Sequence, residues 1–195
     1  FKNKGHDVLF IMDSITRFAQ AQREIGLVLG ESPASKGYPP SVFGILPQLM
    51  ERAGKEKNKG SITAFFTVLA EGDDLNDPIA DHSRSILDGH IALSRELSEN
   101  GIYPPIDILS SISRAMTKDL VDEKHLDIVA KFRKNYALLK ENEILIRYSS
   151  YQKGSDRELD YAMERKAKMD KFLAQDSSEL LDFEAIYKEL SAIFG

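Results

Sequence analysis

The feature that most constrains this chain is a run of five apolar residues, Val8–Met12, which ends at the acidic residue Asp13. An uninterrupted apolar run of this length predicts a short strand that is buried on both faces, as in a parallel sheet covered by helices. Asp13 would then lie at the carboxyl end of that strand. In open α/β sheets the ligand-binding crevices open at this edge, so the run predicts where a site would be.

Asp13 has two interpretations. Its carboxylate can hold Mg²⁺ through water, because Mg²⁺ prefers oxygen ligands and keeps part of its hydration shell. This is the Walker B arrangement of enzymes that transfer phosphoryl groups. Alternatively, Asp13 caps the amino terminus of the helix that follows. The run alone does not decide between them, since short motifs also match by chance.

The composition excludes several classes of protein. The 195 residues contain no cysteine, which excludes disulfides, thiolate metal sites and a cysteine nucleophile. The net charge of −5 is spread evenly, and no basic stripe indicates a nucleic-acid partner. No apolar run in these 195 residues is long enough to span a membrane, and we expect no signal peptide among them. The chain begins at Phe1, almost directly on the predicted strand, so we expect it to be part of a longer protein.

The first 117 residues alternate between predicted helices and strands, which indicates an α/β layer. Residues 31–41 contain three prolines and predict a loop, and Pro47 is expected to kink or delay the next helix. Helices are expected at 14–29 and 42–53, with short ones ending at Leu87 and before Gly101, and further strands at 61–70, 90–93 and 106–112.

The phosphate-binding pattern G-x-x-x-x-G-K-[ST] is absent from the chain. The charged connector 54–60 contains Gly-Lys, but no glycine stands five residues earlier. Residues after 117 predict helices only, with apolar stripes over 126–139, 159–173 and 180–194 and a short helix within 143–151. Asp176 and Glu179 are spaced like a capping box before the last helix. We interpret the stripes of methionine and aromatic residues as the core of a small helical domain.

Four blocks, in this order, resemble the type III secretion ATPases, and among these the flagellar export ATPases most closely. The blocks are DSITRFAQAQREIGL from Asp13, GESPASKGYPPSVFGILPQLMERAG from Gly30, GSITAFFTVLAEGDDLNDPIAD from Gly60 and GIYPPIDILSSISRAM from Gly101. The resemblance continues more loosely into the helical tail. The family is related to the catalytic subunit of rotary ATP synthases. It implies an α/β fold: part of a RecA-like P-loop NTPase parallel sheet with flanking helices (1–117), followed by a small all-helical domain (118–195).

The resemblance also implies roles for single residues. Asp13 matches the Walker B aspartate that orients Mg²⁺ and its water shell. Arg17, one helical turn later, matches an arginine near the transferred phosphate of ATP, with a surface ion pair as the alternative. Tyr103 matches a tyrosine that stacks on adenine, with a rigid aromatic beside two prolines as the alternative.

Arg114 matches an arginine finger, which reaches into the site of the neighbouring subunit. A guanidinium suits this role because it carries a permanent charge and a planar fork of donors. The alternative is a structural salt bridge at a strand end. Asp73, Asp74 and Asp77 match an acidic loop that faces the central channel of the ring, and they are equally suited to capping the next helix.

The chain departs from the family pattern in two respects. The family's P-loop lysine and threonine, its water-activating glutamate and its amino-terminal β-barrel are upstream features that this chain lacks. In the rotary relatives, the segment matching Phe172–Gln175 is followed by an aromatic residue that helps to clamp adenine. Here Asp176 follows.

The function implied by the resemblance is ATP hydrolysis with Mg²⁺ in a cytoplasmic homohexamer that energises flagellar protein export. The implied partners are export chaperones and substrates, a stator-like regulator and a central stalk-like protein, without nucleic acid. The implied location is peripheral, at the inner face of the cytoplasmic membrane beside the export gate. A virulence secretion ATPase and a non-catalytic nucleotide-binding ring subunit remain as alternatives, and we expect the 195 residues alone to be inactive.

Overall fold

The computed structural model describes residues 1–70, 72, 74, 76–148, 150–176 and 178–194. The chain divides into two compact units, Phe1–Asp88 (unit 1) and Gly89–Gly195 (unit 2), which are described separately.

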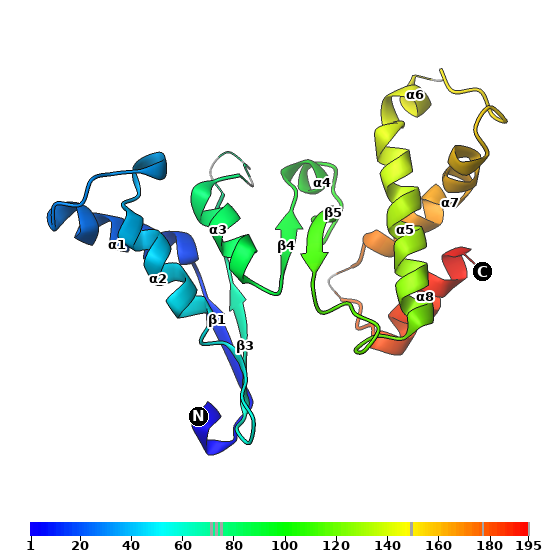
Figure 1. Ribbon diagram of the computed structural model, residues 1–195. Helices are drawn as coiled ribbons and strands as arrows, with labels where there is room; N and C mark the ends of the chain where they lie inside the picture. Colours follow the sequence, from blue (N-terminus) through cyan, green and yellow to red (C-terminus); the bar gives the residue numbers. More distant parts are fainter. Residues whose placement is uncertain (71, 73, 75, 149, 177, 195) are drawn as a thin grey trace. The chain divides into compact units, whose positions relative to one another are not determined.

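In its described residues, unit 1 combines a small sheet with the α-helices α1, α2 and α3 and two short 3-10 helices (Figure 1). Its central strands, β1 and β3, are parallel and in register from Val8 opposite Ile62 to Met12 opposite Phe66, as the predicted parallel sheet requires. The two-residue strand β2 pairs antiparallel with β3 and is too short to have left a sequence pattern. In chain order the elements are η1 (Lys2–Lys4), β1 (Val8–Met12), α1 (Ile15–Val28), η2 (Ser35–Gly37), α2 (Pro40–Met50), β2 (Gly54–Lys55), β3 (Ser61–Phe66) and α3 (Pro78–Ile86).

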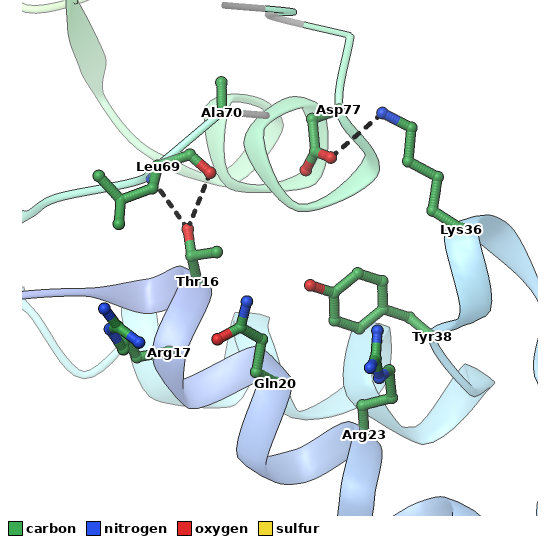
Figure 2. A pocket seen from close by; sticks show the side chains of 9 residues that line it. All are labelled: Thr16, Arg17, Gln20, Arg23, Lys36, Tyr38, Leu69, Ala70 and Asp77. Atoms are coloured by element: carbon green, nitrogen blue, oxygen red, sulfur yellow. Dashed lines mark hydrogen bonds and ion pairs between the residues drawn. The ribbon is translucent and has the colours of Figure 1, made fainter. Parts of the chain in front are cut away.

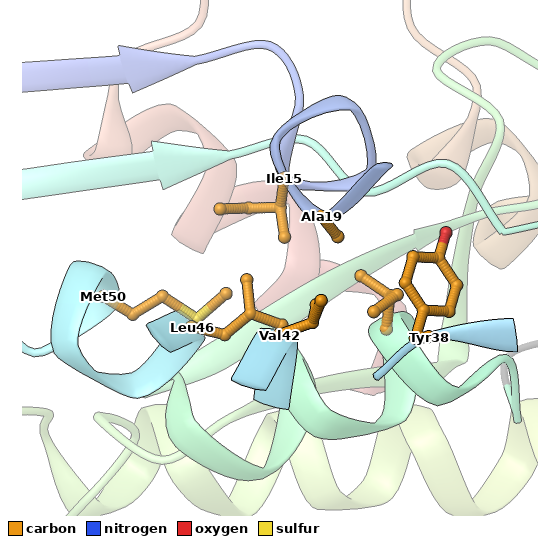
Figure 3. Close-up of a cluster of buried hydrophobic side chains, with 7 residues drawn as sticks. Ile15, Ala19, Tyr38, Val42, Leu46 and Met50 are labelled. Atoms are coloured by element: carbon orange, nitrogen blue, oxygen red, sulfur yellow. The ribbon is translucent and has the colours of Figure 1, made fainter. Parts of the chain in front are cut away.

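The core of unit 1 lies where α1, α2 and α3 meet, next to the carboxyl ends of the strands (Figure 3). Apolar residues at helical spacing on α1 and α2 bring their side chains onto one face. Pro47 lies inside α2, which begins earlier than predicted, at Pro40, because proline is well suited to the first turn of a helix. The buried members of this cluster are Ile15, Ala19, Tyr38, Val42, Leu46, Met50 and Ile79.

The predicted burial of β1 on both faces is wrong for this chain. Leu9, Phe10 and Ile11 are 62%, 41% and 66% exposed. The helices of unit 1 gather at the carboxyl end of the sheet, where Met12 and Phe66 contact the core cluster, and the middle of the strand is left uncovered. The strand's boundaries are nevertheless those that the apolar run predicts.

In its described residues, unit 2 contains an antiparallel pair of strands, followed along the chain by helices α5 to α8 (Figure 1). β4 and β5 pair with each other because the connection between them, which contains the short helix α4, folds back instead of crossing over. The elements are β4 (Gly89–Leu93), α4 (Arg95–Glu99), β5 (Ile106–Ser113), α5 (Glu123–Glu141), α6 (Glu143–Arg147), α7 (Arg157–Leu173) and α8 (Phe183–Phe194). The predicted domain boundary after residue 117 stays a prediction.

Helices α5, α7 and α8 enclose the core of unit 2, as their apolar stripes predict. The predicted capping box is wrong. The Asp176 carboxylate accepts instead from the backbone N–H and hydroxyl of Ser178, and α8 begins six residues later than that box requires, with Asp182 accepting from the Ala185 N–H. The buried core residues are Phe132, Leu139, Leu159, Ala162, Met169, Leu190 and Ile193. No helix in the described ranges has the length and apolar composition to cross a membrane.

Candidate functional site

The carboxyl ends of β1 and β3 bring Asp13 next to Thr67. Because the two strands are parallel and Met12 lies opposite Phe66, the residues that follow them lie side by side. The Thr67 hydroxyl donates to Asp13 Oδ1 at 2.5 Å. Two backbone hydrogen bonds continue the ladder past the strands, from the Thr67 N–H to the Met12 carbonyl (3.0 Å) and from the Ile15 N–H to the Thr67 carbonyl (2.9 Å). The position of Asp13 is therefore fixed from both strands.

Asp13 does not cap α1. The cap is Ser14, whose hydroxyl accepts from the Arg17 N–H at 3.3 Å. Asp13 is exposed, and its second oxygen, Oδ2, accepts no hydrogen bond from any residue that the structure describes. The cap interpretation is thus wrong, and one oxygen of the carboxylate is available to a ligand.

Arg17 lies on the wall of a pocket of about 360 Å³ beside this strand edge (Figure 2). Helix α1 supplies one wall, through residues one turn apart. The loop before α2, the segment after β3 and the start of α3 supply the others. The lining residues are Thr16, Arg17, Gln20, Arg23, Lys36, Tyr38, Leu69, Ala70 and Asp77.

Side-chain contacts hold the pocket walls together. The Thr16 hydroxyl accepts from the Leu69 N–H at 2.8 Å and donates to the Leu69 carbonyl at 3.2 Å, which ties α1 to the segment after β3 (Figure 2). The Arg23 guanidinium carbon lies 5.4 Å from the centre of the Tyr38 ring, a cation–π contact. The sequence analysis named Arg17 but missed Gln20 and Arg23 as site residues. Their three-residue spacing along one helix nevertheless marks a face shared with Arg17.

The pocket carries more positive than negative charge. Three cations line it, Arg17, Arg23 and Lys36, against the single carboxylate of Asp77, which accepts from Lys36 Nζ at 3.3 Å. Within the described part of the chain, no residue forms a hydrogen bond or ion pair with the Arg17 guanidinium. A pocket with this balance suits an anionic group, and guanidinium groups bind phosphate oxygens in pairs.

Two of the three predicted acidic loop residues are described. Asp77 is buried and caps α3 by accepting from the N–H groups of Ile79 (3.0 Å) and Ala80 (3.5 Å), as the capping alternative predicts. Asp74 lies 3.7 Å from Lys36 Nζ. Asp73 lies outside the described residues. The channel-facing role of this loop stays a prediction.

Tyr103 and Arg114 belong to unit 2, on either side of β5, and Asp13 and Arg17 belong to unit 1. The Tyr103 ring is half-exposed, and its hydroxyl lies 3.1 Å from Ser98 Oγ. Its backbone carbonyl accepts from the Gln175 N–H at 2.7 Å. The two segments that the resemblance associates with adenine are therefore in contact. Their role stays a prediction.

Arg114 directly follows β5, as predicted, and its side chain is exposed. Because Arg114 follows the strand directly, the paired backbone of β5 fixes where its long side chain starts. The finger role of Arg114 and the structural salt bridge both stay predictions.

Asp13 and Thr67 fit a magnesium ion of a particular kind. The described residues contain no cluster of three or more His, Asp, Glu or Cys side chains that would form an all-protein metal site. One carboxylate oxygen with a hydroxyl beside it fits an ion that keeps several waters and takes other oxygens from a bound phosphate. The pocket that binds such a phosphate would need the cations that Arg17 and its neighbours provide.

A parallel strand pair that presents a carboxylate at its carboxyl edge, beside a cationic pocket, is typical of α/β domains that bind nucleotides. Comparison with protein families agrees: residues 1–113 match the ATP synthase alpha/beta family, nucleotide-binding domain, and residues 121–192 match the T3SS EscN ATPase C-terminal domain. The chain belongs to the ATP synthase alpha/beta family, as a member of its type III secretion branch.

Similar proteins match along the whole chain. The flagellum-specific ATP synthase of Helicobacter pylori (strain ATCC 700392 / 26695) is 67% identical over 99% of this chain and 44% of its own length. That of Salmonella typhimurium (strain LT2) is 53% identical over 100% of this chain and 42% of its own. The chain thus spans less than half the length of these curated relatives.

A solved structure confirms the fold. The assembled ATPase EscN of the enteropathogenic E. coli type III secretion system superposes with a TM-score of 0.94 and 45% identity, over 99% of this chain and 46% of that one. EscN in complex with its central stalk EscO gives a TM-score of 0.86 at 42% identity, over 99% of this chain and 45% of that one.

Proposed function

We propose that the protein hydrolyses ATP in a homohexameric ring and thereby energises flagellar type III protein export. The observation that carries this proposal is the pairing, in one chain, of an ATP synthase nucleotide-binding match with a type III secretion ATPase carboxyl-terminal match. The identity of 67% to a flagellum-specific ATP synthase favours the flagellar branch.

In this proposal unit 1 handles the phosphate end of ATP. Asp13, oriented by Thr67, would hold Mg²⁺ through water, and Arg17 would bind a phosphate oxygen from the pocket wall. When bound, Mg²⁺ neutralises charge on the phosphates during phosphoryl transfer. Little covalent chemistry is then required of the protein, and its contribution is positioning and charge stabilisation.

Two residues of unit 2 have proposed roles of their own. Tyr103 stacks on adenine, with the Gln175 segment fixed against its backbone. Arg114 acts in trans, on the γ-phosphate of ATP bound to a neighbouring subunit. The site is then complete only at an interface between subunits, so an isolated subunit should be nearly inactive.

Partners and location follow from the same proposal. The EscN relative assembles and binds a central stalk protein, EscO, and we extend a ring and a central stalk-like partner to this protein. Export chaperones and substrates, a stator-like regulator and a peripheral position at the inner face of the cytoplasmic membrane complete it. Nucleic acid is not a partner.

A virulence secretion ATPase is the second candidate function, and the 45% identity to EscN favours it. Deletion of the gene separates the two: loss of flagellar filaments and motility supports the flagellar role. Loss of effector secretion with normal motility supports the virulence role. A non-catalytic ring subunit is the third candidate, and Arg114 variants in the full-length protein address it.

The decisive experiment replaces Arg114 by alanine in the full-length protein. A finger contacts the γ-phosphate mainly in the transition state, so folding, nucleotide affinity and ring assembly should persist while turnover falls roughly 10³-fold or more. Arg114→Lys should restore little, because it brings charge without the planar fork.

Action in trans gives a further test. Subunits with Arg114→Ala are mixed with subunits with Asp13→Ala, each inactive alone. Some interfaces in the mixed rings pair an intact Asp13 with an intact Arg114, and partial activity should return. Mixed rings that co-assemble but stay inactive would overturn the finger assignment, as would a loss of turnover that only follows a lowered Tm.

A further inference from the structure

The pairing of β4 with β5 is interrupted just before Arg114. Gly89 and His90 pair with Ser113 and Ile112, and the register resumes at Ala92 opposite Asp107. Between these pairs, residues 108–111 of β5 stand opposite the single residue Ile91 of β4. The strand that precedes Arg114 therefore contains a large bulge, whose backbone groups need hydrogen-bond partners other than the regular ladder.

Side chains supply those partners. Arg133, on α5, donates to three of the four bulge carbonyls, those of Ile108, Leu109 (3.1 Å) and Ser111 (3.2 Å). His90 Nε2 lies 2.7 Å from the Ser110 carbonyl oxygen and donates to it, since a carbonyl only accepts. The carbonyls of residues 108–111 are thus all bound by a side chain.

The amino side of the bulge is bound by Asp107. Its carboxylate accepts from the N–H groups of Leu109 (2.9 Å) and Ser110 (3.2 Å) and from the Ser110 hydroxyl (2.7 Å). Burial alone raises the pKa of the Asp107 carboxyl, but these hydrogen bonds outweigh it, and the pKa lies below its ordinary value. The Ser111 hydroxyl donates to the Asp107 carbonyl (2.6 Å) and accepts from the Ala92 N–H on β4 (2.9 Å).

Among the hydrogen bonds described above, those of Arg133 come from outside the strand pair. Its guanidinium is half-buried, and its planar fork of donors allows one side chain to bind three carbonyls. A lysine offers its donors from a single nitrogen, and an apolar side chain offers none. Without Arg133 the three carbonyls have to find other donors, and the bulge has to change its path.

Only two residues separate the bulge from Arg114. Ile112 and Ser113 pair with His90 and Gly89, and there the backbones approach so closely that a Cβ on Gly89 would lie 2.5 Å from the Ile112 carbonyl oxygen. The end of β5 therefore has little freedom of its own. A shift of one residue in a strand sends each side chain to the opposite face, so the direction of Arg114 depends on the length and path of the bulge.

We propose that Arg133 is a positioning residue for Arg114: by binding the bulge carbonyls, it sets the direction in which Arg114 leaves β5 and thus the efficiency of phosphoryl transfer. The proposal rests on the proposed function of Arg114 as a finger. It also gives the helical half of the chain a physical link to ATP hydrolysis, because Arg133 is part of α5, whose Phe132 lies in the helical core.

The test uses Arg133→Met in the full-length protein, with Lys134→Met as the matched control. Lys134 is the next residue of α5, and its side chain is 66% exposed in an ion pair with Glu158. Misplacing a catalytic group by about 1 Å can cost on the order of 10²-fold, so Arg133→Met should lower kcat roughly 10- to 100-fold with KM for ATP nearly unchanged. Lys134→Met should retain kcat within about twofold, since exposed ion pairs contribute little.

A double-mutant comparison separates positioning from general destabilisation. If Arg133 acts through Arg114, adding Arg133→Met to Arg114→Ala should cause no further loss of turnover. In mixed rings, Arg133→Met subunits should complement Asp13→Ala subunits, as Arg114→Ala subunits do. If Arg133→Met rings fail to assemble by native mass spectrometry, Arg133→Lys is used in the same comparisons, with a smaller loss of kcat expected.

Two results would overturn the inference alone: Arg133 variants that match Lys134→Met in kcat, or losses that multiply with Arg114→Ala. Full turnover by Arg114→Ala itself would overturn the proposed function, and the inference with it. The two failures are therefore distinguishable.

Discussion

Replacing Ile15 by alanine should destabilise unit 1 substantially. Ile15 is the first residue of α1, is 0% exposed and belongs to the core cluster beneath the candidate site. The change removes three carbon atoms, worth about 2.4 kcal/mol at about 0.8 kcal/mol per buried carbon. The cavity left in a close-packed core adds to this, so we expect a loss of about 3–4 kcal/mol.

Ile25→Ala is the matched control, because it is the same substitution in the same helix. Ile25 is 52% exposed, so about half of its transfer free energy is at stake and the surrounding side chains leave no closed cavity. We expect a loss of about 1 kcal/mol. The difference of about 2–3 kcal/mol between the variants measures burial alone, since both gain similarly from alanine's helix propensity.

The assay is urea unfolding of the chain followed by hydrogen exchange in peptides from each unit, because the two units need not unfold together. With a slope of about 2 kcal/mol per molar urea, Ile15→Ala should lower the unit 1 midpoint by about 1.5–2 M and Ile25→Ala by about 0.5 M. Peptides from unit 2 should change little. Equal midpoints for the two variants would refute the placement of the core between α1, α2 and α3.

Three further predictions concern other residues. In the folded protein the pKa of the Asp107 carboxyl lies below its ordinary value of 3.8. Its stabilising contribution is therefore present above pH 3.8 and is lost as the pH falls through the folded pKa. With Asp107→Asn, the free energy of unfolding of unit 2 should fall less steeply as the pH is lowered. Asp77→Ala should cost about 1–2 kcal/mol by removing the α3 cap, and Asp77→Asn much less, measured by urea unfolding. Calorimetry should find only weak Mg-ATP binding to the 195 residues, because no P-loop pattern is present and Asp13 cannot replace one; micromolar binding would contradict this.

Local signals predicted the elements of the chain well. The five apolar residues Val8–Met12 form a strand with the predicted boundaries, and the helix after Asp13 begins one residue later than predicted, at Ile15. Such signals depend on neighbours in the sequence, namely an apolar run, a serine cap and helical spacing. They also placed Arg114 directly after its strand.

Features set by distant residues were not predictable in this way. An uninterrupted apolar run indicates a strand whose faces can be buried, but the middle of β1 is exposed because the helices of unit 1 gather at its end. Asp176 and Glu179 had the right spacing for a cap, yet Ser178 competes for the Asp176 carboxylate and Asp182 caps α8.

The candidate site shows the same division. One sequence motif predicted the positions of Asp13 and Arg17. Thr67, which binds Asp13, lies at the end of another strand more than fifty residues away, and no local pattern pointed to it. Arg133 lies still further along the chain from these motifs. Nothing in the sequence around it indicates that its side chain binds the carbonyls of a strand. Its role became visible only when the interrupted register of β5 left those carbonyls without regular partners.

Two contacts from the helical half reach the residues that would handle ATP in unit 2, one on each side of β5. The Gln175 N–H binds the Tyr103 carbonyl before the strand, and Arg133 binds the bulge that precedes Arg114 at its end. A rotation or shift of α5 relative to β5 would disturb the second contact, because three hydrogen bonds join the Arg133 guanidinium to the bulge. If Tyr103 and Arg114 have the roles proposed above, a movement of the helices against β5 would change the contacts to adenine and to phosphate together.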